Sequence, residues 1–255
     1  TVGEIVDYLD NLLTGGSKAS VQEDVQEDVQ EATEKATETV RRYTLKAIPY
    51  PESGFAMKGL VDAKSIAVTK DDFGIGTELA MLLQERGINA AVVDGIKESH
   101  DGVIFLGGLS KSKSIDTLLA VNQSAFEAAK VVSKRLTESG GIFVTVQSTG
   151  GQFGLSRIEK AWTGGLPGLV KTASHEWPEA SLKAIDIEAV NKRTPREIAE
   201  ALRNELCSGG SEIEVGLRAD GNRFRLESVA EVIEETAGSI SSESVMVVSG
   251  GARGV

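Results

Sequence analysis

The stretch IAVTKDDFGIG, from Ile66 to Gly76, decides how the fold of this chain is interpreted. Its apolar beginning is typical of a buried strand, and its two glycines are typical of a turn from a strand into a helix. In dinucleotide-binding folds such a turn lets the backbone approach a pyrophosphate, and the amides of the helix N-terminus hold the anion. The stretch therefore predicts the first strand, turn and helix of an α/β unit.

The end of the chain repeats this pattern. The stretch MVVSGGARGV, from Met246 to Val255, aligns without a gap on Ile66 to Ile75, so that Ser249 matches Thr69 and Gly254 matches Gly74. The second motif has the small residues that a phosphate-binding turn needs. Its candidate cofactor-binding residues are Ser249, Gly250, Gly251, Arg253 and Gly254.

The first motif departs from that chemistry at three positions. Lys70, Asp71 and Asp72 stand where small residues would let the backbone lie against a pyrophosphate. Their side chains would crowd the turn, and the two carboxylates would repel the anion. We therefore predict that Gly74 and Gly76 serve only the packing of the strand–helix turn and do not bind a nucleotide.

Strands and helices are expected to alternate from about residue 41. The expected strands lie near 41–50, 65–69, 88–94, 102–109, 141–146 and 182–188, and the expected helices near 77–87, 114–140, 165–177 and 194–206. Thr194, Pro195 and Glu197 predict a capped helix start. Asp220-Gly221 predicts a β-hairpin turn. The fold class predicted is α/β: a Rossmann-like, doubly wound parallel sheet with a short antiparallel hairpin and an N-terminal helical segment.

The first forty residues differ in character from the rest. Residues 1–14 have the apolar spacing of a short amphipathic helix. Residues 15–40 are acidic, with seven acids against one lysine between Val21 and Val40. We interpret this second segment as a linker, with helical structure left open and with partner docking as the alternative.

Composition excludes several classes of function. The chain has 255 residues and a net charge of −11, which argues against a nucleic-acid partner. It lacks an apolar run long enough to span a membrane and has no recognisable signal peptide. Two histidines and a single cysteine, Cys207, argue against a zinc site, and no metal-binding residues are predicted. The cysteine count fits a reducing compartment, so we expect a cytoplasmic protein.

Taken together, the two motifs resemble the short-chain dehydrogenase/reductase family, and specifically the ketoreductase region of polyunsaturated fatty acid synthases and type I polyketide synthases. In that region a degenerate structural half precedes a catalytic half that binds NADPH. The family's Thr-Gly-x-x-x-Gly-x-Gly motif is matched by Thr69, Gly74 and Gly76, with Lys70 replacing its first glycine, and again by Ser249 to Val255. The residues of the second motif are more similar to those of the polyunsaturated fatty acid synthases.

The resemblance implies a division of the chain into four parts. Residues 1–14 look like the last helix of an acyl carrier protein, and 15–40 are the acidic linker. Residues 41–244 are similar to the structural half, and 245–255 would be the first strand and glycine turn of a catalytic half present only in part. Arg253 could meet the 2′-phosphate of NADPH in a continued fold.

Family catalysis requires Tyr-x-x-x-Lys, in which the tyrosine donates a proton and the lysine lowers its pKa. The tyrosines of this chain are Tyr8, Tyr43 and Tyr50, and the residues four positions later are Leu12, Ala47 and Gly54. The family alignment puts Glu159 and Thr163 at the tyrosine and lysine positions, so neither role is filled. Ser148 lies near the family's substrate-orienting serine but is interpreted as a hydrogen-bonding residue at a strand end. No catalytic residue is predicted.

Several other residues receive structural interpretations. His175 and Glu176 are expected to be a packed or exposed pair on a helix, and His100 and Asp101 a pair at the start of a strand. Trp162 and Trp177 are expected in the core or in a contact between the two halves.

The leading hypothesis is thus a non-catalytic structural half of a ketoreductase, with no cofactor of its own. In the parent synthase, NADPH would reduce a β-ketoacyl group, held on a carrier protein's phosphopantetheine arm, to a β-hydroxyacyl group. The expected partners are the catalytic half and neighbouring domains, including the acyl carrier protein. The alternative is a self-contained degenerate Rossmann module that binds a partner or ligand without catalysis.

Overall fold

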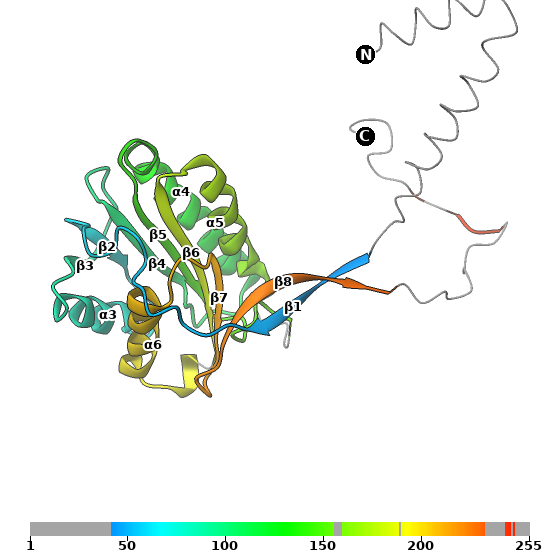
Figure 1. Cartoon of the computed structure of the whole chain (residues 1–255). Coiled ribbons are helices and arrows are strands. Elements are labelled where there is room, and N and C mark those ends of the chain that lie inside the picture. The colour runs from blue at the N-terminus through cyan, green and yellow to red at the C-terminus, as the bar shows by residue number, and fades with distance from the viewer. Residues whose placement is uncertain (1–41, 156–159, 189, 233–242, 246, 248–255) are drawn as a thin grey trace, which may run out of the picture. The chain divides into compact units, whose positions relative to one another are not determined.

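A computed structural model describes residues 42–155, 160–188, 190–232, 243–245 and 247 (Figure 1). Thr44–Val229 forms one compact unit, and Thr1–Tyr43 together with Ala230–Val255 belongs to a second. The predicted N-terminal helical segment, the acidic linker and nearly all of residues 245–255 lie outside the described residues. The domain boundaries proposed from the sequence therefore stay predictions.

An eight-stranded sheet runs through the larger unit, in the order β1-β8-β7-β6-β5-β4-β2-β3. The strands from β2 to β7 pair in parallel, and β8 pairs antiparallel with β7. This confirms the predicted fold class for the sheet and its hairpin. The strand bounds are β1 Arg42–Pro49, β2 Ile66–Thr69, β3 Ala90–Val93, β4 Gly102–Gly108, β5 Gly141–Gln147, β6 Ala180–Ile187, β7 Glu214–Leu217 and β8 Arg223–Glu231.

Helices cover both faces of this sheet, as expected when strand–helix–strand units alternate (Figure 1). One face carries α3 (Ile75–Gln84) and α6 (Pro195–Ser208), which contact each other. The other carries α4 (Ile115–Ser139) and α5 (Gly165–Glu176), with the short 3₁₀ helix η1 (Ala161–Gly164) before α5. A second 3₁₀ helix, η2 (Val190–Lys192), precedes α6.

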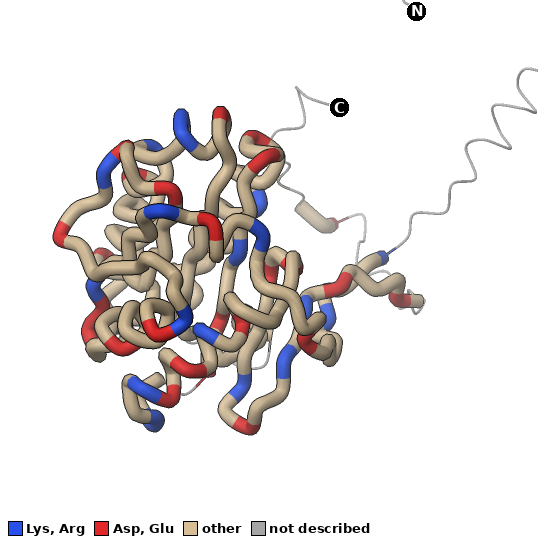
Figure 2. The backbone as a smooth tube through the Cα atoms, turned by 60° about the vertical axis from the view of Figure 1, so that its left-hand side comes forward, with Lys and Arg blue, Asp and Glu red and all other residues tan. Residues whose placement is uncertain are grey.

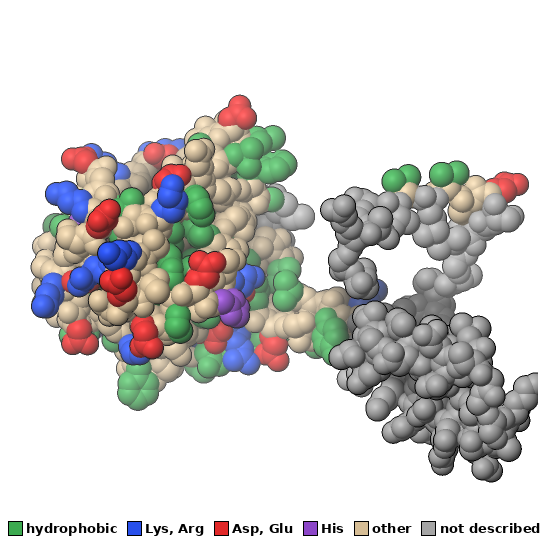
Figure 3. All heavy atoms as spheres, turned by 90° about the horizontal axis from the view of Figure 1, so that it is seen from above, with side chains coloured by type: hydrophobic (Ala, Val, Ile, Leu, Met, Phe, Trp, Pro, Cys, Tyr) green, Lys and Arg blue, Asp and Glu red, His purple; other side chains and the backbone are tan. Residues whose placement is uncertain are grey.

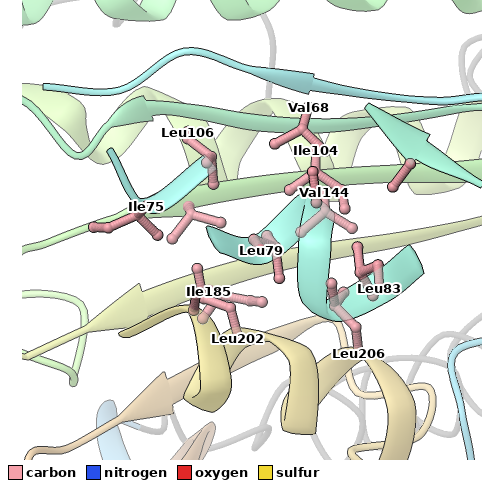
Figure 4. Packing of buried hydrophobic residues seen from close by; sticks show 14 of the residues in the cluster. Val68, Ile75, Leu79, Leu83, Ile104, Leu106, Val144, Ile185, Leu202 and Leu206 are labelled. Carbon is pink, nitrogen blue, oxygen red and sulfur yellow. The ribbon is translucent and has the colours of Figure 1, made fainter. Parts of the chain in front are cut away.

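Each face of the sheet has its own hydrophobic core. Between the sheet and α3/α6, Leu79 and Leu83 of α3 and Leu202 and Leu206 of α6 lie in one cluster with apolar strand residues such as Val144 (Figure 4). The strand residues are apolar without alternation because both faces are covered.

The second core includes the T-shaped ring pair Phe143 and Trp177, with centroids 5.9 Å apart. Trp177 is therefore a core residue, as predicted. Trp162 is not in the core: its side chain is half exposed on η1.

Local signals in the sequence located two connections correctly. The side chain of Thr194 accepts a hydrogen bond from the Glu197 amide, and Glu197 accepts one from the Thr194 amide at 2.7 Å, so the capping box is complete. The β7–β8 turn contains Gly221 at a φ of 86°, a conformation that glycine adopts without strain. Both predictions are confirmed.

Acidic and basic residues are interspersed along the backbone of the larger unit (Figure 2), and apolar side chains lie among charged ones on the surface (Figure 3). In the described parts of the chain, no helix has the length and apolar character needed to cross a membrane.

Candidate functional site

The candidate site is the first glycine turn, where β2 leads into α3. The carboxylate of Asp71 accepts hydrogen bonds from the backbone amides of Phe73 at 2.7 Å, Ile75 at 3.1 Å and Gly76 at 2.7 Å. Two of these amides belong to the first turn of α3, which has no partner for them within the helix. Asp71 thus places a negative charge at the position where a nucleotide-binding turn receives a phosphate.

The two glycines of this turn are required by its geometry. Gly74 precedes α3 with a φ of 82°, in the left-handed region that favours glycine. A Cβ on Gly76 would lie 2.9 Å from the carbonyl oxygen of Thr69, which is closer than side chains normally approach backbone. The predicted packing role therefore has a physical basis at Gly76, whereas Gly74 is favoured by its backbone conformation, since a Cβ there would meet no atom within 4 Å.

Lys70, in place of the motif's first glycine, forms an ion pair with Asp94, which directly follows β3. The hydrogen bond from Lys70 lowers the pKa of the Asp94 carboxyl. In dinucleotide-binding folds, an acid about twenty residues after the glycine turn receives the ribose hydroxyls. Asp94 stands at that distance from Gly74, and Lys70 already engages it.

Asp72 connects the same turn to the loop after β4. Its carboxylate accepts hydrogen bonds from the Lys111 amide at 2.8 Å and the Ser110 hydroxyl at 3.0 Å. The hydrogen bond from the Lys111 backbone is the main cause that lowers the pKa of Asp72. The Lys111 ammonium lies over the Phe73 ring, 4.9 Å from its centroid. All three residues that replace small residues in this motif therefore have partners within the chain.

The sequence predicted that Lys70, Asp71 and Asp72 would crowd a pyrophosphate and repel it at this turn. It did not predict that the Asp71 carboxylate would accept hydrogen bonds from the amides of the turn itself. An acid five residues before the second glycine of a strand–Gly-x-Gly turn is the signal that would have found it. A carboxylate in that position can reach the free amides of the helix.

A second carboxylate organises the loop after β5. Asp186, fully buried at the end of β6, accepts hydrogen bonds from the amides of Thr149 at 2.6 Å and Phe153 at 2.7 Å. Burial raises the pKa of Asp186. Ser148, next to Thr149, directly follows β5, as the sequence predicted. This loop is thus held in shape from within the protein.

The structure places the other singled-out residues apart from this turn. Thr163 is buried in η1, where its hydroxyl donates to the Lys160 carbonyl oxygen at 2.9 Å, and Glu159 lies outside the described residues. His175 and Glu176 are exposed at the end of α5. Within the described ranges, no three potential ligands gather around a metal position. The residues from Ser249 to Gly254 are not described, so their cofactor role stays a prediction.

His100 and Asp101 are a buried pair before β4. His100 Nδ1 accepts a hydrogen bond from the Lys97 amide at 2.9 Å, and burial lowers its pKa. Asp101 forms an ion pair with Arg135 of α4 and accepts the Lys64 amide at 2.8 Å. The interpretation as a pair at the start of a strand is confirmed.

Comparisons with known proteins found similarity in both sequence and fold. Over 105 residues, or 41% of the chain, it is 30% identical to one of the subunits of the polyunsaturated fatty acid synthase of Thraustochytrium sp.. Among solved structures, it matches the adenylation, ketoreductase and pseudo-Asub structure of a keto acid-selecting NRPS module with a TM-score of 0.60 and 14% identity. The chain is thus similar in sequence to part of a fatty acid synthase subunit and in fold to part of a synthase structure that includes a ketoreductase. The resemblance inferred from the sequence is confirmed.

The chain covers a small share of these relatives. It spans 4% of the fatty acid synthase polypeptide, and it matches 21% of the NRPS structure with 87% of its own length. A ketoreductase domain of the bacillaene assembly line is matched more weakly, with a TM-score of 0.44 and 14% identity over 74% of this chain and 38% of that domain's chain. A Burkholderia cenocepacia short-chain dehydrogenase in complex with NADP is matched with a TM-score of 0.47 and 15% identity over 63% of this chain and 89% of the dehydrogenase. No family model matches the chain.

Proposed function

We propose that this chain is the structural, non-catalytic half of a ketoreductase in a multifunctional fatty acid or polyketide synthase. It supplies a Rossmann-like scaffold against which a catalytic half docks. The catalytic half binds NADPH and reduces a β-ketoacyl group on an acyl carrier protein to a β-hydroxyacyl group. The scaffold holds no cofactor of its own.

The observation that carries this proposal is the set of hydrogen bonds that the Asp71 carboxylate accepts from the backbone amides of Phe73, Ile75 and Gly76. A pyrophosphate at this turn would need the same amides and would meet a carboxylate already bonded to them. Lys70 also forms an ion pair with Asp94, the acid that a ribose would use, but both side chains are largely exposed, so this pair adds little to the proposal.

The sequence supports the non-catalytic role in a second way. None of the three tyrosines is followed four residues later by a lysine, so the proton donor and its activating cation are both missing from the chain. Residues 245–255 are, under this proposal, the opening of the catalytic half. Cytoplasmic localisation and contacts with carrier-protein domains follow from the same proposal.

The test is a ketoreduction assay with a model β-keto thioester and NADPH. This chain alone is expected to show no NADPH oxidation above background. A longer polypeptide from the same reading frame, continuing through a Tyr-x-x-x-Lys motif beyond Val255, is expected to reduce the substrate. Turnover by the chain alone would overturn the proposal, and an immediate natural stop codon after Val255 would favour the self-contained binding module.

A further inference from the structure

The segment from Arg42 to Ala56 is attached to the protein with little apolar burial. It comprises β1 and most of the loop that follows, 15 residues in all, and each of these residues is at least partly exposed. β1 lies at the edge of the sheet, beside β8 (Figure 1). Directly after the segment, Met57 enters the core with only 2% of its surface exposed. We call residues 42–56 the β1 arm, and its attachment depends mainly on polar contacts.

The loop part of the β1 arm runs along the end of α6. The amide of Gly54 donates a hydrogen bond to the carbonyl oxygen of Ser208 at 2.9 Å, and the amide of Met57 donates one to Leu206 at 2.8 Å. Both carbonyl groups belong to the last turn of α6, where a helix has no partners of its own for them. The arm and the residue after it therefore cap α6.

One side chain, Arg223 at the start of β8, joins the β1 arm to α6. Its Nη1 donates to the carbonyl oxygen of Tyr50 at 3.0 Å and to that of Pro51 at 3.4 Å. Its Nε and Nη2 donate to the carboxylate of Glu205 at 2.7 and 3.0 Å, and Nη2 also donates to the carbonyl oxygen of Gly209 at 2.9 Å. A guanidinium has five N–H donors in a fixed fork, and this arrangement gives each part of the fork a partner. We call these contacts the Arg223 clasp.

The clasp is bound more firmly to α6 than to the β1 arm. The carboxylate of Glu205 is fully buried and also accepts a hydrogen bond from Lys183 Nζ at 2.6 Å. Arg223 therefore keeps its carboxylate partner whether or not the arm is in place. If the arm left, Nη1 would exchange two backbone carbonyl oxygens for water, and no buried charge would lose its counter-charge. Detaching the arm is thus far less costly than breaking the pair of Arg223 with Glu205.

We propose that the β1 arm is a detachable strap, which opens and closes as one unit on the folded sheet and is held closed by the Arg223 clasp. Opening separates β1 from β8 and uncovers the end of α6, while the parallel strands β2 to β7 stay folded. The 15 freed residues can extend to about 50 Å, so opening lets the chain before Arg42 move that much further from the sheet. This inference does not rest on the proposed function.

Amide hydrogen exchange of the full chain, followed by mass spectrometry at low urea concentrations, tests the proposal. The amides of residues 44–57 are expected to exchange together and with less protection than those of β5. Their exchange should also depend less steeply on urea, because local opening exposes less surface than global unfolding. Equal protection and equal urea dependence in the arm and in β5 would mean that the arm opens only when the whole protein unfolds, and would overturn the proposal.

Two matched variants test the role of the clasp, since each replaces one cation of Glu205 with methionine. Arg223→Met should lower the protection of the arm amides by about tenfold or more, because hydrogen bonds from a charged donor to the arm are lost. Lys183→Met removes no contact with the arm, so the arm amides should stay as protected as in the wild type even where the protection of β5 changes.

If Arg223→Met does not fold, as judged by circular dichroism, Arg223→Lys takes its place, because an ammonium lacks the fork that reaches Glu205 and the arm together. Arm amides as protected in the Arg223 variant as in the wild type would overturn the assignment of the clasp. The same conclusion would follow if Lys183→Met changed the protection of the arm and of β5 by equal factors.

Discussion

The carboxylate of Asp71 lies 2.7 Å from the backbone nitrogen of Gly76, on the first turn of α3. This contact puts an anion of the chain's own at a helix N-terminus that, in a nucleotide-binding turn, would receive a phosphate. The same carboxylate also holds the turn together, so its removal should affect stability.

We expect Asp71→Ala to lower the free energy of unfolding by about 1–2 kcal/mol, the usual effect of losing a side chain that caps a helix N-terminus. Asp71→Asn, which keeps one acceptor oxygen, should lose less. Urea denaturation followed by circular dichroism measures both. Asp62→Ala, at an exposed residue, is the control; an equal loss there would show that the effect is not specific to the turn.

Gly76→Ala should destabilise the protein by roughly 1–3 kcal/mol, as overpacking does in a close-packed interior. The new Cβ would approach the Thr69 carbonyl oxygen, a backbone atom that cannot rotate away. Gly168→Ala is the matched control, because a Cβ there meets no atom within 4 Å and Gly168 lies within α5. The control should be neutral or more stable by up to about 1 kcal/mol. A stable Gly76→Ala protein would contradict the packing role of Gly76.

A buried charge cluster joins β6, α6 and β8. Glu205 accepts hydrogen bonds from Lys183 Nζ at 2.6 Å and from Arg223 Nε and Nη2 at 2.7 and 3.0 Å, and the side chains of Lys183 and Glu205 are fully buried. Burial lowers the pKa of Lys183. Arg223 also donates to the Tyr50 carbonyl oxygen at 3.0 Å, so it links the segment after β1 to the cluster.

Glu205→Gln should lower the free energy of unfolding by about 3–5 kcal/mol, because it leaves two buried cations without their anion. Lys183→Met should be neutral or stabilising, because the Glu205–Arg223 pair survives and one desolvated ammonium is removed. The pKa of Lys183 is lowered in the folded state. The free-energy cost of burying its ammonium is therefore greatest at low pH and falls as the pH rises toward about 10.4, where the side chain loses its proton. Any advantage of Lys183→Met should therefore shrink in alkaline buffer. A loss of several kcal/mol in Lys183→Met at pH 7 would contradict this account.

The buried His100 should make stability depend on pH. Its pKa is lowered below the ordinary 6.5 by burial, so the folded state favours the neutral ring. The stability that neutral His100 contributes to the fold is fully present above pH 6.5 and is lost as the pH falls through the lowered folded-state pKa. In thermal denaturation, the melting temperature should decrease less from pH 7 to pH 5 for His100→Gln than for the wild type. His175→Gln, at an exposed position, should behave like the wild type, and identical pH profiles for all three proteins would contradict the prediction.

The sequence was sufficient for the order of strands and helices because its local signals are strong. The apolar runs of β4 and β5, the capping box at Thr194 and the Asp220-Gly221 turn each have one favoured structure. The same reasoning could not place Trp162, because an aromatic residue near a helix start is compatible with core and surface alike.

The contacts of charged residues were beyond the sequence for a physical reason. Whether Asp71 points toward solvent or toward the amides of α3 depends on backbone geometry several residues away. Glu205, Lys183 and Arg223 are far apart along the chain and look like ordinary surface residues in their local patterns. Only tertiary packing buries them together, so no periodicity could have marked them.

The most direct test of the account is a calorimetric titration of the chain with NADPH. Because the Asp71 carboxylate occupies the amides of the first glycine turn, we expect no saturable binding up to about 1 mM NADPH. Stoichiometric binding with a dissociation constant in the micromolar range, abolished by a substitution in the first turn such as Gly74→Val, would contradict the central claim that this half holds no cofactor.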